Sequence, residues 1–68
     1  MRHIILYADE DGYWIAECPS LPGCNSQGAT EQEAIENIKE AIELYIEVLE
    51  ERGESLPEDH THLRVLQV

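Results

Sequence analysis

Residues 30–53, TEQEAIENIKEAIELYIEVLEERG, decide the fold. They open with a capping box, in which the Thr30 hydroxyl accepts a hydrogen bond from the Glu33 amide and the Glu33 side chain reaches back. Apolar residues then recur every three or four positions, which predicts one long helix with a broad apolar face. Gly53 and Pro57 predict its end after about six turns. The apolar stripe consists of Ile35, Ile38, Ile42, Tyr45 and Leu49.

Upstream of the helix, two runs rich in β-branched and aromatic residues predict strands at His3–Ala8 and Tyr13–Cys18. The intervening Asp9–Gly12 has the composition of a tight turn, so the two strands form a hairpin. Prolines 19 and 22 end the second strand because proline cannot donate to a ladder. A short, partly exposed third strand is expected at Cys24–Gly28.

The hairpin is predicted to be apolar on both faces. Pairing Ala8 with Tyr13 places one apolar set on each face. One face then carries Ile4, Leu6, Ala8 and Ile15, and the other carries Ile5, Tyr7, Trp14 and Ala16. A single helix covers only one of these faces, and the sequence does not say which. We therefore expect a second copy or another protein to cover the other face.

After the helix, Leu63–Val68 is predicted to be a last strand because of Val65, Leu66 and Val68. The expected order is β-β-β-α-β in an α+β fold, with a mostly antiparallel sheet and one long helix on one face. At 68 residues the chain makes one domain, residues 1–68.

The charge balance excludes one class of function. Four Lys and Arg stand against fifteen Asp and Glu, a formal net charge of −11. Nucleic-acid binders neutralise phosphates with cations, so direct nucleic-acid binding is not expected, whereas a basic protein partner is favoured. The sequence shows no signal peptide and no membrane span, which predicts a cytoplasmic protein with reduced thiols.

No constellation of residues predicts catalysis. The acidic run Asp9–Asp11 is a conceivable magnesium or calcium site, but a solvated turn is the commoner meaning. His60 and His62 could join Cys18 or Cys24 at zinc, although the spacing matches no zinc motif, and surface histidines are commoner. A disulfide between Cys18 and Cys24 is disfavoured by the reducing compartment. We expect no enzyme activity, metal or cofactor.

Several stretches together resemble the HicB family of antitoxins. The first is Asp11–Cys24, DGYWIAECPSLPGC, with its strand and Pro-x-Leu-Pro-Gly-Cys turn; the second is Gln27–Thr30, QGAT, leading into Glu33-Ala34; the third is the acidic helix. The resemblance implies a truncated RNase H-like fold and the masking of a small basic HicA toxin, an mRNA-cleaving ribonuclease. Many HicB proteins carry a C-terminal DNA-binding domain, and none is expected within these 68 residues.

Two groups of side chains are candidates for partner binding. On the helix they are the acidic face and the leucine within it, for which a solvated face is the alternative. On the hairpin they are large aromatic residues, of which one of the neighbours Tyr13 and Trp14 should be core and the other interface. The full set is Tyr7, Tyr13, Trp14, Glu36, Glu40, Glu43, Leu44 and Glu47. The alternative function is a stand-alone homo-oligomeric scaffold or ligand-binding domain without a toxin.

Overall fold

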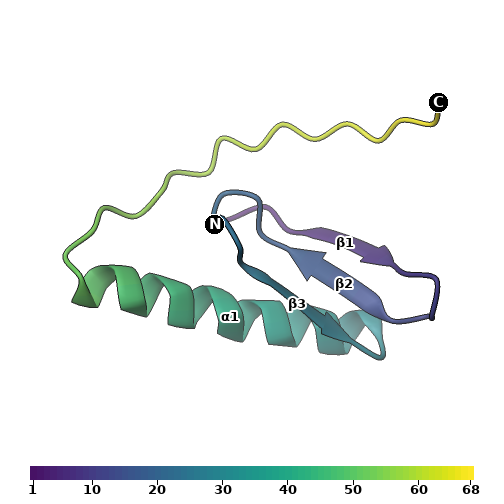
Figure 1. Ribbon diagram of the computed structural model, residues 1–68, viewed down its shortest axis with the longest axis horizontal. Helices are drawn as coiled ribbons and strands as arrows, with labels where there is room; N and C mark the ends of the chain where they lie inside the picture. Colours follow the sequence, from purple (N-terminus) through teal and green to yellow (C-terminus); the bar gives the residue numbers. More distant parts are fainter.

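The computed structural model describes residues 1–68 and consists of one sheet and one helix (Figure 1). The elements are β1 (Ile5–Ala8), β2 (Trp14–Glu17), β3 (Asn25–Gly28) and α1 (Glu31–Glu51). The sheet is antiparallel with strand order β1-β2-β3, and α1 lies across one of its faces. The predicted hairpin, third strand and long helix are confirmed.

The predicted hairpin register is wrong by one residue. Ala8 pairs with Trp14, not with Tyr13. The cause is the turn, in which one Asp9 carboxylate oxygen accepts hydrogen bonds from the amides of Asp11 and Tyr13, each at 2.9 Å. This arrangement lengthens the loop by one residue, and such a slip sends every β2 side chain to the opposite face.

The helix side of the sheet therefore carries Trp14 and Ala16 rather than Ile15. Ala16 is fully buried and Trp14 is half-buried against the core, together with Leu6 from β1. The face away from α1 retains Ile5, Tyr7 and Ile15. The expectation that the hairpin is apolar on both faces thus holds, with a different set of residues on each.

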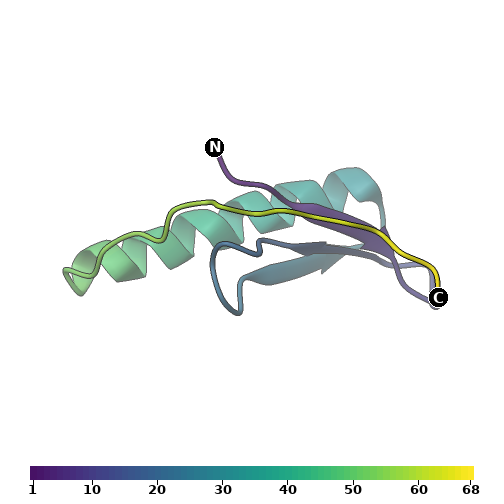
Figure 2. The same ribbon diagram turned by 90° about the horizontal axis from the view of Figure 1, so that it is seen from above.

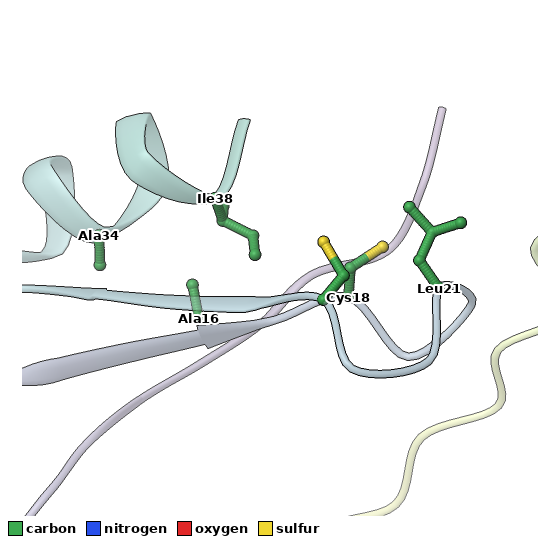
Figure 3. Close-up of a cluster of buried hydrophobic side chains, with 6 residues drawn as sticks. Ala16, Cys18, Leu21, Ala34 and Ile38 are labelled. Carbon is green, nitrogen blue, oxygen red and sulfur yellow. The ribbon is translucent and has the colours of Figure 1, made fainter. Parts of the chain in front are cut away.

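The core lies between the sheet and the first half of α1, and the loop after β2 closes one end of it (Figure 3). Leu21 folds back from this loop and is fully buried. The Cys18 amide donates to the Cys24 carbonyl at 3.0 Å, which joins the two ends of the loop. The Tyr45 hydroxyl donates to the Pro22 carbonyl at 2.9 Å and ties the same loop to the helix. The buried residues are Ala16, Cys18, Leu21, Cys24, Ala34 and Ile38.

Both ends of α1 lie where the sequence predicts, but only the Thr30 half of the predicted capping box is formed. The Thr30 hydroxyl accepts a hydrogen bond from the Glu33 amide at 3.1 Å, which satisfies one of the free donors of the first turn. Gly53 adopts the left-handed conformation, with φ of 68°, and its amide donates to the Glu50 carbonyl. The next amide, of Glu54, donates to the Leu49 carbonyl, which completes a Schellman cap.

The predicted last strand at Leu63–Val68 is wrong. Residues 54–68 form no helix or strand and run back past the sheet as an extended tail (Figures 1 and 2). Apart from the helix-capping amide of Glu54, the tail makes no backbone hydrogen bond to the rest of the chain, and a strand requires such a ladder. The tail is held near its start, where the Asp59 carboxylate accepts hydrogen bonds from the His3 amide and ring.

Candidate functional site: two partner-binding surfaces

The outward face of α1 is a continuous acidic surface. Its glutamates are all exposed, and none of them forms an ion pair. The only hydrogen bond to any of their carboxylates comes from the Gln32 side-chain amide, which donates to Glu36 at 3.2 Å. We call this set the acidic helix face: Glu36, Glu40, Glu43 and Glu47. Like charges three or four residues apart on a helix repel by a few tenths of a kcal/mol per pair, so this face weakens the isolated helix.

Leu44 lies in the middle of the acidic helix face and is 62% exposed. With Glu40, Glu43 and Glu47 it lines a shallow depression of about 370 Å³. Single exposed leucines are ordinary, but this one is flanked on one side by carboxylates that form no ion pair with any residue of the chain. The predicted helix residues therefore lie together on one surface.

An apolar groove adjoins this surface and was not predicted. It has a volume of about 360 Å³ and is lined by Leu44, Tyr45, Val48, Leu49 and Arg52. It exists because α1, at 21 residues, spans about 31 Å, whereas four-residue strands span about 13 Å, so the helix continues beyond the sheet (Figure 1). The one indication of this groove in the sequence is Val48, which flanks the apolar stripe of the helix. In the structure Val48 is 43% exposed.

The aromatic candidates lie on the hairpin, away from the acidic helix face. Tyr7 is 43% exposed on the uncovered side of the sheet, and its hydroxyl donates to the Glu17 carboxylate at 3.1 Å. This hydrogen bond, together with desolvation and nearby carboxylates, raises the pKa of Tyr7. Tyr13 is 49% exposed in the loop, while Trp14 faces the core. The structure thus separates the predicted residues into a helix surface, a sheet surface and one core residue.

The potential metal ligands of the sequence do not gather. No group of three or more His, Cys, Asp or Glu side chains is arranged to hold a metal ion. His3 bonds Asp59 and His60 bonds Glu58, both at the protein surface. Cys18 and Cys24 are free thiols in the core, and burial raises the pKa of Cys24. The single helix, α1, does not meet the length and apolarity that a membrane-spanning helix requires.

Comparison with known proteins gives consistent relatives. A UPF0150 protein of Thermoplasma acidophilum is 51% identical over 57 residues, covering 84% of this chain and 83% of its own. A UPF0150 protein of Synechocystis is 45% identical over 65 residues, covering 96% of this chain and 82% of its own. No solved structure matches.

The profile of one protein family, described as HicB-like antitoxin of bacterial toxin-antitoxin systems, matches residues 3–67. This range takes in the hairpin, the loop that closes the core and all of α1. By this match and by its relatives, the chain belongs to the HicB-like antitoxin family.

Proposed function

We propose that the chain is the inhibitory partner of a small basic HicA-type toxin that cleaves mRNA, and that it acts by masking the toxin. Family membership supports an antitoxin role without enzymatic activity. The observation that carries the choice of a cationic partner is the acidic helix face, whose four carboxylates form no ion pair within the chain and face a single nearby cation, Lys39. Because the toxin acts on messages, the proposal places the chain in the cytoplasm.

The physical reason is that a cationic partner gains attraction here without breaking any ion pair. Exposed carboxylates of one sign steer a basic protein toward the helix and raise the rate of association. The same partner relieves the repulsion between neighbouring glutamates, so part of the cost of the acidic helix face is recovered on binding.

In this proposal Leu44 is the apolar centre of the interface. Interfaces derive most of their energy from a few central residues that a polar rim protects from water. Leu44 has Glu40, Glu43 and Glu47 on one side and the apolar groove on the other, so the carboxylates form a polar rim along one side of a larger apolar contact.

We assign Tyr7 and Tyr13 to a second contact surface on the uncovered side of the hairpin, and Trp14 to the core. The proposal treats residues 1–68 as one HicB-like domain with a truncated RNase H-like arrangement, supported by the antiparallel β-β-β-α order. It requires no metal, cofactor or nucleic acid.

The proposal requires a small basic protein to be encoded beside this chain, and the test is to co-express the chain with the product of the adjacent reading frame. We expect a stable complex that has no ribonuclease activity. Replacing Glu43→Lys and Glu47→Lys should weaken binding by about tenfold or more, equivalent to about 1.4 kcal/mol. Since the pair of substitutions changes the net charge by four, the matched control is Glu10→Lys together with Glu54→Lys, two exposed positions outside the acidic helix face.

The control should bind like the unaltered chain, apart from a smaller loss that disappears with added salt. A neighbour that stays toxic and does not co-purify would contradict the proposal. Equal weakening by the two pairs of substitutions would contradict the assignment of the surface but not the inhibition itself.

A second candidate function, a homo-oligomeric scaffold or ligand-binding domain without a toxin, is favoured by the uncovered side of the sheet with Ile5, Tyr7 and Ile15. Self-association and toxin binding are compatible. The two functions differ in the fate of the basic neighbour, which only the antitoxin inhibits.

A further inference from the structure

Cys18 and Cys24 lie opposite each other where β2 and β3 leave the sheet. The register of these strands pairs Glu17 with Asn25, and the next pair along the ladder is Cys18 with Cys24. The Cys18 amide donates to the Cys24 carbonyl at 3.0 Å, so the pairing continues to this position. Residues directly opposite in an antiparallel pair have Cα atoms about 4.5–5.5 Å apart, within the range of about 4.4–6.8 Å that a disulfide spans.

The two side chains also point to the same side of the sheet. Both are free thiols and belong to the core that faces α1. Burial and the neighbouring Cys18 thiol raise the pKa of Cys24, so the two sulfur atoms are close enough to interact electrostatically. Neither cysteine belongs to the surfaces assigned to the toxin. The pair therefore has the register and the orientation that an intrachain disulfide needs.

A relay of hydrogen bonds reaches the sulfur of Cys18. The Arg2 guanidinium donates to the Ser20 hydroxyl oxygen at 2.9 Å, and this oxygen lies 3.5 Å from the Cys18 sulfur. Because the oxygen accepts from a cation, the hydroxyl hydrogen is left to donate to the sulfur and is more strongly polarised. A donor in this place stabilises negative charge on Cys18, and the thiolate is the form of cysteine that attacks an oxidant.

We infer that Cys18 and Cys24 form a reversible oxidation site for a small peroxide. The Cys18 sulfur attacks one peroxide oxygen, and the O–O bond breaks to give a sulfenic acid on Cys18 and a hydroxide. The Cys24 sulfur then attacks the Cys18 sulfur, the S–O bond breaks, and a second hydroxide leaves. The hydroxides take up the protons that the two thiols lose. Two thiols and one hydrogen peroxide thus give one disulfide and two waters, and the two electrons lost by sulfur reduce the peroxide.

The surroundings of the pair restrict the oxidant to a small molecule. The loop after β2 forms a depression of about 230 Å³, and the residues that line it include both cysteines. Hydrogen peroxide, which is about the size of two waters, fits such a space, whereas a larger reagent needs the loop to open. A reducing compartment keeps the resting state reduced and returns the disulfide to thiols after oxidation.

The disulfide fastens the loop that closes the core. It joins the two ends of the segment that carries Leu21, which is fully buried, and Pro22, whose carbonyl accepts from the Tyr45 hydroxyl (Figure 3). A cross-link of this kind restricts the unfolded chain, so the oxidised protein resists unfolding better than the reduced one. We expect the midpoint of urea unfolding to rise by about 1–2 M on oxidation.

The test is to add hydrogen peroxide to the folded chain and to follow the intact mass. We expect a loss of the mass of two hydrogen atoms, no link between chains, and recovery with dithiothreitol. Cys24→Ser should stop at a sulfenic acid on Cys18, which dimedone traps, whereas Cys18→Ser should give no trapped product. Circular dichroism checks that each variant is folded. An unaltered chain that keeps its mass while a cysteine peptide is oxidised, or disulfides formed only between chains, would overturn the inference.

A matched pair of substitutions tests the relay. Ser20→Ala removes the hydroxyl beside the Cys18 sulfur, and Ser55→Ala removes an exposed hydroxyl outside the loop. We expect Ser20→Ala to slow disulfide formation by about tenfold and Ser55→Ala to leave it unchanged. Labelling by iodoacetamide reports opening of the loop, so a merely structural defect speeds labelling and oxidation together, whereas loss of the relay slows oxidation. Oxidation of Ser20→Ala at the rate of the unaltered chain, or faster, would contradict the relay. None of these results bears on inhibition of the toxin.

Discussion

Gly28 should resist the smallest possible substitution, because it lies where β3 meets the start of α1. A Cβ atom built at this position lies 2.5 Å from the Ala34 amide nitrogen and 2.9 Å from the Glu33 carbonyl carbon, against ordinary contacts of 3.4 Å or more. Both neighbours are backbone atoms of the first helical turn, so no side chain can rotate away. Gly28→Ala therefore forces the helix and the strand apart.

The expected size of the effect follows from two opposing contributions. Overpacking a tight contact costs about 1–3 kcal/mol. Replacing glycine by alanine also restricts the unfolded chain, and this effect by itself raises the free energy of unfolding by about 0.4–1 kcal/mol. We expect a net destabilisation of about 1–2 kcal/mol, which is substantial for a domain of this size, whose total stability is on the order of 3–10 kcal/mol. Urea unfolding followed by Trp14 fluorescence, repeated at several protein concentrations, measures the free energy of unfolding.

Gly12 supplies the control, because its requirement for glycine has a different cause. Its φ is 86° and no atom lies within 4 Å of an added Cβ, so Gly12→Ala suffers from backbone strain alone. Asparagine tolerates this conformation, so Gly12→Asn should be less harmful than Gly12→Ala, whereas Gly28→Asn should be worse than Gly28→Ala. A Gly28→Ala protein as stable as the parent would refute the steric reasoning.

Three further predictions concern the core, the helix start and the tail. Ile38→Ala removes a fully buried side chain and should cost about 2–5 kcal/mol in urea unfolding, with Leu44→Ala on the exposed face as a nearly neutral control. Thr30→Ala removes the hydroxyl that accepts from the Glu33 amide and should cost about 1 kcal/mol, and Thr30→Ser should restore most of it. Asp59→Asn should free the tail, seen as sharper NMR signals from residues 60–68, without unfolding the sheet. Since the pKa of Asp59 is lowered by folding, the anchor should be intact above the ordinary aspartate pKa of about 3.9 and should loosen only as the pH falls below it.

The helix was predictable in detail because its signals are local. The Thr30 cap, the apolar period and the glycine at position 53 each act within a few residues, and the structure confirms all three, except that the Glu33 side chain does not return the predicted hydrogen bond to the Thr30 amide. The hairpin was predictable as a hairpin for the same reason, since a turn composition lies between two β-rich runs.

The hairpin register was not predictable, because it depends on a single carboxylate. Asp9 accepts from two amides of the loop, and nothing in the composition of residues 9–12 distinguishes this loop from one that is a residue shorter. Because of this error, Trp14 was predicted on the face of Tyr7 and Ile15 on the face of Leu6, whereas the structure has Trp14 on the face of Leu6 and Ile15 on the face of Tyr7. The burial of Leu21 was missed as well, because a leucine between two prolines gives no periodic signal.

The candidate site was partly predictable. Helical spacing alone placed the four glutamates and Leu44 on one surface. The apolar groove beside them depends on the difference in length between the helix and the strands. This difference is a property of the assembled fold and has no counterpart in a local pattern.

The two cysteines offer a way to time the motions of the loop that closes the core. Both cysteines are buried in the core at the two ends of this loop, at 2% and 7% exposure, so an alkylating reagent reaches their thiols only while this part of the structure is open. Their labelling rate, compared with that of an unfolded chain, would report the free energy of this one opening. The two native cysteines thus serve as probes of local opening at this end of the sheet, and mass spectrometry can follow their labelling without any engineered residue.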